Sequence, residues 1–273
     1  MKRLSIAVCL LLMMSVQAVF AAEYSVGVVP QFEARRLHQI WRPILDYLQQ
    51  KTGHTFKLEG SPTIPEFETE FEAGRFDFVY MNPYHLIVAN REQGYRPILR
   101  DVGRELFGLL VVRIDSQIQK MQDLEGKVIA FPAPNALGAS LQMRQELHDL
   151  FGLQIVPRYV KTHDSVYLNV LLGQADAGGG VQKTLNRQQP QIRKALKIIH
   201  KTRPVAPHPI AVHPRVPAEA AEKVTRALLA LGETPEGAAL LAKIPIKKIG
   251  RAGLQDYEIL KTMKLERFYV KSR

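Results

Sequence analysis

Two short segments of this sequence combine residue types that bind small polar ligands. The first contains Tyr80, Asn82 and Tyr84, where an apolar run over residues 76–81 gives way to a helical pattern. Two aromatic rings and one amide at the end of a strand would form a wall against such a ligand. The same residues fit equally well a core tyrosine followed by an Asn-Pro turn, so both interpretations stay open.

The second segment, residues 132–140, joins an apolar strand pattern to an amphipathic helical pattern. Its small residues would let backbone N–H groups approach a ligand, and the amino end of the following helix would favour a negative charge. The candidate contacts are Asn135, Ala136, Leu137, Gly138, Ala139 and Ser140. The alternative is an ordinary strand-to-helix turn that Ser140 caps.

His163 and Asp164 add two polar side chains just before a third helical pattern, over residues 166–172. The imidazole can donate a hydrogen bond to an oxyanion. Asp164 fits either an N-cap, which we favour, or an acceptor for a cationic group of the ligand. Three glycines at 178–180 allow either a close backbone approach or a flexible turn.

The sequence contains no motif typical of catalysis or of metal binding. His208 and His213 lie among prolines, and no HExxH, Walker, GxGxxG or GxSxG motif occurs. The single cysteine, Cys9, lies within the first 21 residues. We therefore expect no enzyme activity, no metal ion and no cofactor. The basic residues are scattered rather than interleaved with aromatics, so we expect no nucleic-acid partner.

The amino terminus has the pattern of a secretory signal peptide. Lys2 and Arg3 precede an apolar run over residues 4–16, and small residues lead to a cleavage site after Ala21. No later segment is long and apolar enough to cross a bilayer, so we expect a periplasmic protein. Without residues 1–21 the chain keeps 35 Lys and Arg against 26 Asp and Glu, and this excess favours anionic ligands.

The elements that must position these residues alternate between strand and helix patterns. A first series has strands over 24–29, 55–58, 76–81 and 96–99 and helices over 37–48, 65–71 and 84–93. A second has strands over 128–131, 155–160, 175–177 and 196–199 and helices over 140–151 and 166–172. Runs over 106–112 and 210–212 fit two crossings between the series, and helices over 218–231 and from 234 onward follow.

This alternation predicts an α/β fold with largely parallel sheets. We expect two α/β lobes with a ligand cleft between them. Residues 22–108 and 212–273 would form the first lobe, and residues 109–211 the second. Ligands of open α/β sheets gather at the carboxyl ends of strands and the amino ends of helices, and the three polar segments lie at such positions.

Several short motifs, taken in order along the chain, resemble the phosphate-, phosphite- and phosphonate-binding proteins (PhnD type) of ABC importers. These motifs are Gly27–Pro30 with Trp41–Pro43, Asp77–Tyr84, Leu124–Lys127, His163 with Gly173–Gly178, and Thr234–Gly237. The resemblance covers nearly all of the chain after the signal peptide. It implies a type II periplasmic-binding-protein fold.

The resemblance also implies how a ligand is held. Members of this family typically bind an anionic head group with a hydroxyl-rich turn after an Asp-Pro pair, together with a histidine. His163 and Asp164 match family positions, the second being a carboxylate that meets an amine in some members. Ala133 stands where the acid is expected, and Ala136, Leu137 and Gly138 stand at the hydroxyl positions. Loss of these hydroxyls changes specificity rather than fold.

The function implied is that of a periplasmic solute-binding protein of an ABC-type importer, with a membrane permease as its partner. Its lobes would close around a small anion resembling a phosphonate, phosphate or phosphite. The alternative is a periplasmic sensory input protein that reports a different small ligand to a histidine kinase or chemoreceptor.

Overall fold

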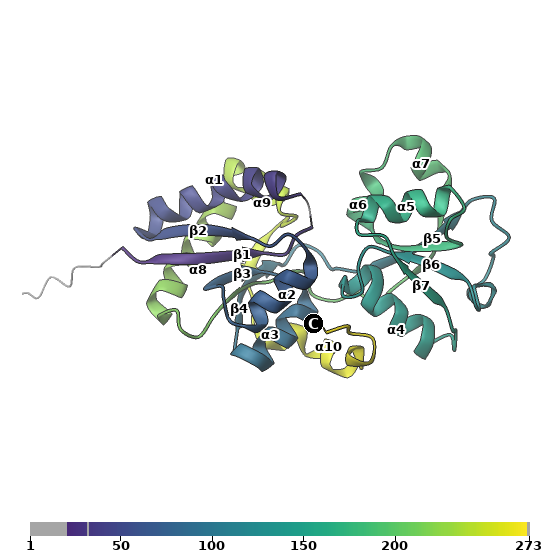
Figure 1. The fold of residues 1–273 in the computed structure, drawn as a ribbon. Coiled ribbons are helices and arrows are strands. Elements are labelled where there is room, and N and C mark those ends of the chain that lie inside the picture. Colours follow the sequence, from purple (N-terminus) through teal and green to yellow (C-terminus); the bar gives the residue numbers. More distant parts are fainter. Residues whose placement is uncertain (1–20, 32, 272–273) are drawn as a thin grey trace, which may run out of the picture.

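The computed structural model describes residues 21–31 and 33–271, so the predicted signal peptide lies outside the described residues apart from Ala21. Figure 1 shows two α/β bodies side by side, each built on its own sheet, with linkers running between them. The two-lobed α/β architecture expected from the sequence is therefore confirmed. Within the described ranges, no helix has both the length and the apolar character needed to cross a membrane.

The first lobe is built on a six-stranded mixed sheet with the order β11-β4-β10-β3-β1-β2. Its strands are β1 (Glu23–Val28), β2 (Thr55–Gly60), β3 (Phe78–Tyr80), β4 (Arg96–Asp101), β10 (Ile210–Val212) and β11 (Ile249–Arg251). Strand β1 pairs in parallel with β2 and β3, as predicted. Strand β10 lies antiparallel between β3 and β4, because the chain returns from the second lobe in the opposite direction.

Helix α1 forms where the apolar pattern of the sequence predicts a helix. It spans Ala34–Thr52 and buries the predicted apolar stripe, including Leu37, Trp41 and Leu48. Pro43 lies inside the helix, and Gly53 ends it in the left-handed conformation, with φ of 73°. The lobe's other helices are α2 (Ile64–Glu72), α3 (Pro83–Gln93), α8 (Ala218–Gly232), α9 (Pro235–Lys243) and α10 (Glu258–Thr262), with short 3-10 turns at Leu254–Tyr257 and Leu265–Arg267.

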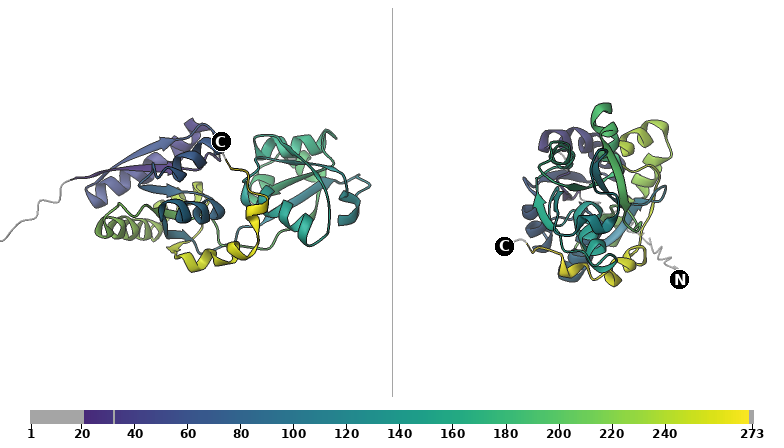
Figure 2. Two further views of the ribbon diagram at one scale, coloured as in Figure 1. Left: turned by 60° about the horizontal axis from the view of Figure 1, so that its bottom comes forward. Right: turned by 90° about the vertical axis from the view of Figure 1, so that its right-hand side faces the viewer.

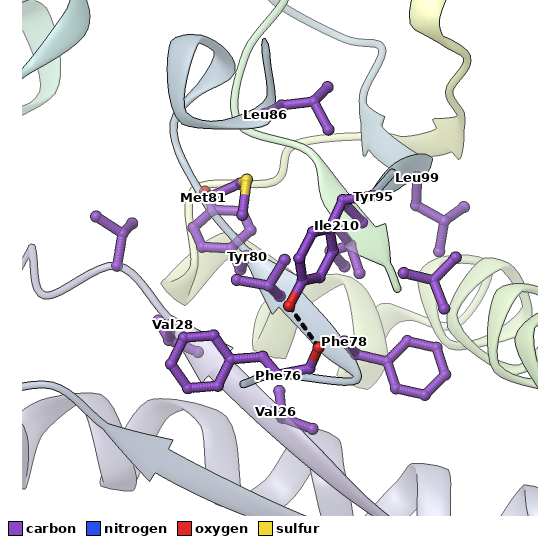
Figure 3. Close-up of a cluster of buried hydrophobic side chains, with 14 of the residues drawn as sticks. Val26, Val28, Phe76, Phe78, Tyr80, Met81, Leu86, Tyr95, Leu99 and Ile210 are labelled. Carbon is purple, nitrogen blue, oxygen red and sulfur yellow. Dashed lines mark hydrogen bonds between the residues drawn. The ribbon is translucent and has the colours of Figure 1, made fainter. Parts of the chain in front are cut away.

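The core of the first lobe forms where the central strands meet α3 and β10. Figure 3 shows side chains from β1, β3, β4 and β10 converging on this region, with Tyr95 buried among them. The Tyr95 hydroxyl donates a hydrogen bond of 2.6 Å to the carbonyl oxygen of Phe76. This bond satisfies the only polar group of a fully buried ring, and it fixes the chain directly before β3.

The second lobe is built on a five-stranded sheet with the order β7-β6-β8-β5-β9. Its strands are β5 (Gly108–Arg113), β6 (Val128–Phe131), β7 (Val156–Tyr159), β8 (Ala177–Val181) and β9 (Leu196–Lys201). Its helices are α4 (Gln142–Asp149), α5 (His163–Leu171), α6 (Gln182–Asn186) and α7 (Pro190–Lys194), with a 3-10 turn at Met121–Leu124 and a π-helical turn at Leu137–Leu141. Strands β6, β7 and β8 run parallel, whereas β5 is antiparallel to β8 and β9.

Three predictions made from the sequence pattern are wrong in detail. The helix expected over 140–151 begins only at Gln142, because a π-helical turn occupies the preceding five residues. The strand expected over 175–177 instead spans Ala177–Val181 and contains the three glycines, so they do not form a flexible turn. The 210–212 run is a strand of the first sheet rather than a crossing.

The two crossings are the linkers 102–107 and 202–209, which join β4 to β5 and β9 to β10. They lie side by side, because Leu106 N donates to Val205 O at 2.8 Å and Val205 N donates to Leu106 O at 2.9 Å. Thr202 Oγ1 accepts a further bond of 2.8 Å from Gly108 N. The lobes are thus joined by a short paired segment, the usual form of a hinge between two domains.

Candidate functional site

The carboxyl edges of the two parallel strand sets face each other across the lobe boundary. In the first lobe, β1 and β3 lead into α1 and α3. In the second, β6, β7 and β8 lead into the π-helical turn, α5 and α6. Asn82, at the start of α3, donates from Nδ2 to the carbonyl oxygen of Asn135 at 3.2 Å. Ligand sites of α/β proteins lie at such edges.

Asn82 and Asn135 are both buried and belong to one polar network between the lobes. The side-chain oxygen of Asn82 caps α3 by accepting from the backbone N–H groups of Tyr84 and His85, both at 2.9 Å. Asn135 Nδ2 lies 2.9 and 3.0 Å from the two carboxylate oxygens of Glu68. Glu68 also lies 2.9 Å from His85 Nε2. In this network Asn135 fastens the second lobe to the first.

The C-terminal segment, residues 265–271, joins the same network. Val270 N donates to Asn135 Oδ1 at 2.9 Å, and Val270 O accepts from Asn135 Nδ2 at 2.7 Å. Arg144 Nη2 donates to the carbonyl oxygen of Phe268 at 2.8 Å. Figure 2 shows this yellow segment leaving the first lobe and passing between the two lobes. No pattern in the sequence predicts an interlobe role for this tail.

Tyr80 and Tyr84 are core side chains of the first lobe. The Tyr80 hydroxyl donates to the carbonyl oxygen of Ile244 at 3.0 Å, and its ring stacks on His208 with centroids 5.4 Å apart. Tyr84 packs against Tyr269, with centroids 5.5 Å apart. The structure thus places Tyr80 as the core interpretation predicts, and the role of both tyrosines as ligand contacts stays a prediction.

The predicted anion-binding turn is buried over most of its length. Leu137 belongs to the hydrophobic core of the first lobe. The backbone of the turn rests directly on the second sheet, since a Cβ atom at Gly108 or Gly179 would lie 1.9 Å from the carbonyl oxygens of Gly138 and Ala139 respectively. Ser140 is wholly buried within the π-helical turn, so the prediction that it caps a helix is wrong.

His163 and Asp164 are the first two residues of α5. The N-cap is Thr162, whose hydroxyl accepts from Ser165 N at 3.1 Å, so the favoured capping role of Asp164 is wrong. Asp164 instead accepts from Gln188 Nε2 at 2.6 Å. His163 Nδ1 is buried and has no hydrogen-bond partner among the described residues. Burial lowers the pKa of His163 to about 4, so the ring is neutral at pH 7.

Four cationic residues that the sequence analysis missed gather around these elements. Arg36 lies in the first turn of α1, Arg104 in the first linker, Lys183 in α6 and Arg187 at the end of α6. Burial, and then the charges of Arg187, Arg104 and Arg36, lower the pKa of Lys183 to about 8. In Figure 1, α6 lies on the side of the second lobe that faces the first.

His208, in the second linker, completes the group. Gln31 Nε2 lies 2.7 Å from His208 Nε2. Burial first, and Arg104 next, lower the pKa of His208 to about 3, so the ring is neutral at pH 7. We call the set Arg36, Arg104, His163, Lys183, Arg187 and His208 the interlobe cationic site. Among the described residues, no three His, Cys, Asp or Glu side chains lie together as metal ligands would.

Two carboxylates lie among these cations. Arg104 Nε is 2.8 Å from Asp101 Oδ2, and Asp164 raises the pKa of Arg187 against the stronger opposing effects of burial and Arg36. Cationic side chains that lie between two lobes attract an anion. The signal was not visible in the sequence, since the four cations come from three separate segments.

A comparison with protein families gives one match over most of the chain. The family described as "ABC transporter, phosphonate, periplasmic substrate-binding protein" matches residues 26–257.

Solved structures share the two-lobed fold. A binding-protein component of an ABC phosphonate transporter from Pseudomonas aeruginosa has a TM-score of 0.78 at 16% identity, over 91% of this chain and 88% of its own. PhnD1 from Prochlorococcus marinus, in complex with methylphosphonate, has a TM-score of 0.78 at 14% identity, with 90% and 98% covered. A Xanthomonas citri protein bound to ATP gives 0.76 at 17% identity, also with 90% and 98% covered.

Proposed function

This chain belongs to the family of periplasmic substrate-binding proteins of phosphonate ABC transporters, and on that basis we propose that it holds a small phosphonate-like oxyanion between its lobes. The family consists of binding proteins rather than enzymes, and it favours transport over the alternative of a sensory input protein. We further propose that the chain is exported by the predicted signal peptide, acts in the periplasm and delivers its ligand to an ABC permease.

The interlobe cationic site is the observation that carries this proposal. Its residues come from the first lobe, the second lobe and both linkers, so an anion bound there contacts parts of the protein that move relative to each other. A ligand that binds the closed arrangement more tightly than the open one shifts the population toward closure. The closed form is then the state that a permease recognises.

Hydrogen-bond donors complement the charges at this site. His163 presents a buried Nδ1 without a partner among the described residues, at the amino end of a nine-residue helix. Helix amino ends stabilise bound anions. We propose His163 as a direct contact of the oxyanion. The contacts predicted for the turn 135–140, for Asp164 and for Tyr80, Asn82 and Tyr84 stay predictions.

Titration calorimetry on ligand-stripped protein tests the proposal, with methylphosphonate, phosphite and inorganic phosphate as probes. We expect at least one of them to bind, and the variant Arg36→Gln to bind it more weakly. Lys51→Gln is the matched control, because Lys51 lies in the same helix about 22 Å from Arg36 at 1.5 Å per residue. Absence of heat with all three probes, or equal losses in both variants, would contradict the assignment.

A further inference from the structure

The C-terminal segment, residues 265–271, connects the two lobes at a place separate from the two linkers. We infer that this segment acts as a latch. Its bonds with the second lobe hold the lobes in the arrangement of this structure, and these bonds must break before the lobes can separate. A latch acts on the lobes whether or not a ligand is bound, so this role goes beyond the proposed function.

The beginning of the segment is anchored in the first lobe. Leu260, Met263 and Leu265 are all buried in the core of that lobe. Just before α10, the Tyr257 hydroxyl donates to the carbonyl oxygen of Pro207 in the second linker at 3.0 Å. Because buried apolar contacts fix this end, separation of the lobes has to break the contacts that the rest of the segment makes with the second lobe.

Neighbouring residues of the segment bind different lobes. The backbone of Val270 exchanges two hydrogen bonds with the Asn135 side chain of the second lobe, at 2.9 and 2.7 Å. Tyr269 contacts the first lobe instead: its ring packs on Tyr84, and its hydroxyl donates to Glu72 Oε1 at 3.3 Å. The segment therefore binds both lobes at once, in agreement with its path between them in Figure 2.

Arg144, on α4, is a second residue of the second lobe that holds the segment. Its Nη2 donates at 2.8 Å to two carbonyl oxygens, that of Phe268 in the segment and that of Pro134 in the second lobe. Its guanidinium also lies over the Phe268 ring, with Cζ 5.9 Å from the centroid. Arg144 is only 9% exposed. Release of the segment would take an acceptor from a buried cation, which is costly.

Weaker contacts continue along the exposed end of α4. Arg267 Nη1 lies 3.3 Å from Asp149 Oδ1, and the His148 ring meets the Phe268 ring edge-on, with centroids 5.7 Å apart. An exposed ion pair contributes little to stability. The strength of the latch therefore lies in the backbone bonds of Phe268 and Val270, which involve buried partners.

The experiment measures how often the lobes separate, from the alkylation rate of a cysteine placed at their interface. Leu137→Cys is the reporter, because Leu137 lies in the π-helical turn of the second lobe and is buried in the core of the first. Leu147→Cys is the control reporter, because Leu147 is buried in the second lobe's own core. Cys9, the only cysteine of the sequence, lies within the predicted signal peptide. Where reclosing is faster than labelling, the rate is proportional to the open population.

Val270→Pro removes the N–H that donates to Asn135, and Val270→Ala, which keeps it, is the matched control. We expect Leu137→Cys to be alkylated roughly 5-fold faster with Val270→Pro, the change in equilibrium that loss of one hydrogen bond brings. Leu147→Cys should react equally fast with both. Arg144→Met is a second variant with the same expected effect. Its control is Arg193→Met, because Arg193 donates to Asn186 O at 3.1 Å within the second lobe.

Two results would overturn the latch. One is equal alkylation of Leu137→Cys with Val270→Pro and Val270→Ala, together with no faster alkylation for Arg144→Met than for Arg193→Met. The other is an equal acceleration at Leu147→Cys, because the segment would then stabilise the second lobe itself and not its contact with the first. These measurements use no ligand, so a failure of the proposed oxyanion function and a failure of the latch are seen separately.

Discussion

Replacing Asn135 by alanine tests whether the buried network fastens the lobes together. Its side chain donates to the Glu68 carboxylate and exchanges two bonds with the backbone of Val270. A bond to a charged group contributes about 1.5–3 kcal/mol and a neutral bond about 1 kcal/mol. The bond to Glu68 and the two bonds to Val270 together give an expected loss of about 4 kcal/mol in the free energy of unfolding. About half of this loss should come from the bond to Glu68, whose carboxylate is buried at 1% exposure and keeps its contact with His85.

The assay is urea unfolding followed by circular dichroism, with the free energy obtained by linear extrapolation. Asn186→Ala is the matched control, because Asn186 is exposed and its side chain accepts one bond, from Gln182 Nε2 at 2.8 Å. We expect the control to lie within about 0.5 kcal/mol of the parent protein. A loss for Asn135→Ala no larger than that of the control, with an unchanged slope, would refute the reasoning.

Three further predictions concern the second lobe. Thr162→Ala removes the cap of α5 and should cost about 1 kcal/mol in thermal unfolding, whereas Asp164→Ala should cost less, because Asp164 is not the cap. Gly179→Ala should destabilise strongly, since its Cβ would lie 1.9 Å from a carbonyl oxygen, while Gly60→Ala, with open space around it, should be tolerated. The pKa of His163 is lowered to about 4 in the fold. As the pH falls, this histidine therefore takes up its proton at a higher pH in the unfolded chain than in the folded protein. Stability should therefore decline between pH 6.5 and about 4, and His163→Gln should flatten that decline in pH-dependent unfolding.

Local patterns in the sequence were sufficient to predict most helices and strands and the division into two lobes. The apolar stripe of α1 has helical periodicity, and Thr234 followed by Pro235 starts α9 as predicted, with Thr234 Oγ1 accepting from Gly237 N at 3.1 Å. Capping of α5 was assigned to the wrong residue, because Thr162 and Asp164 are both good caps and differ by only two positions in register.

The cationic site could not be predicted, because its composition depends on how two lobes and two linkers meet. Arg36, Arg104 and Lys183 are separated by more than 60 residues each, and none belongs to a motif. The hydrogen bond between the Val270 backbone and the Asn135 side chain could not be predicted either, because these residues are 135 positions apart in the sequence. Hydrophobic periodicity indicates which face of a helix or strand is buried. It does not indicate which distant helix or strand packs against that face.

The position of β10 sets an order in which the two lobes can be completed during synthesis. Residues 108–201 form the second sheet from one uninterrupted stretch, so all its strands exist once Lys201 has emerged. The first sheet has a gap between β3 and β4 that only Ile210–Val212 fills. Until then these two strands have unpaired edges, which are prone to aggregation. The lobe that begins first is therefore finished last, and the edges of β3 and β4 that β10 covers stay open until residue 212 has been made.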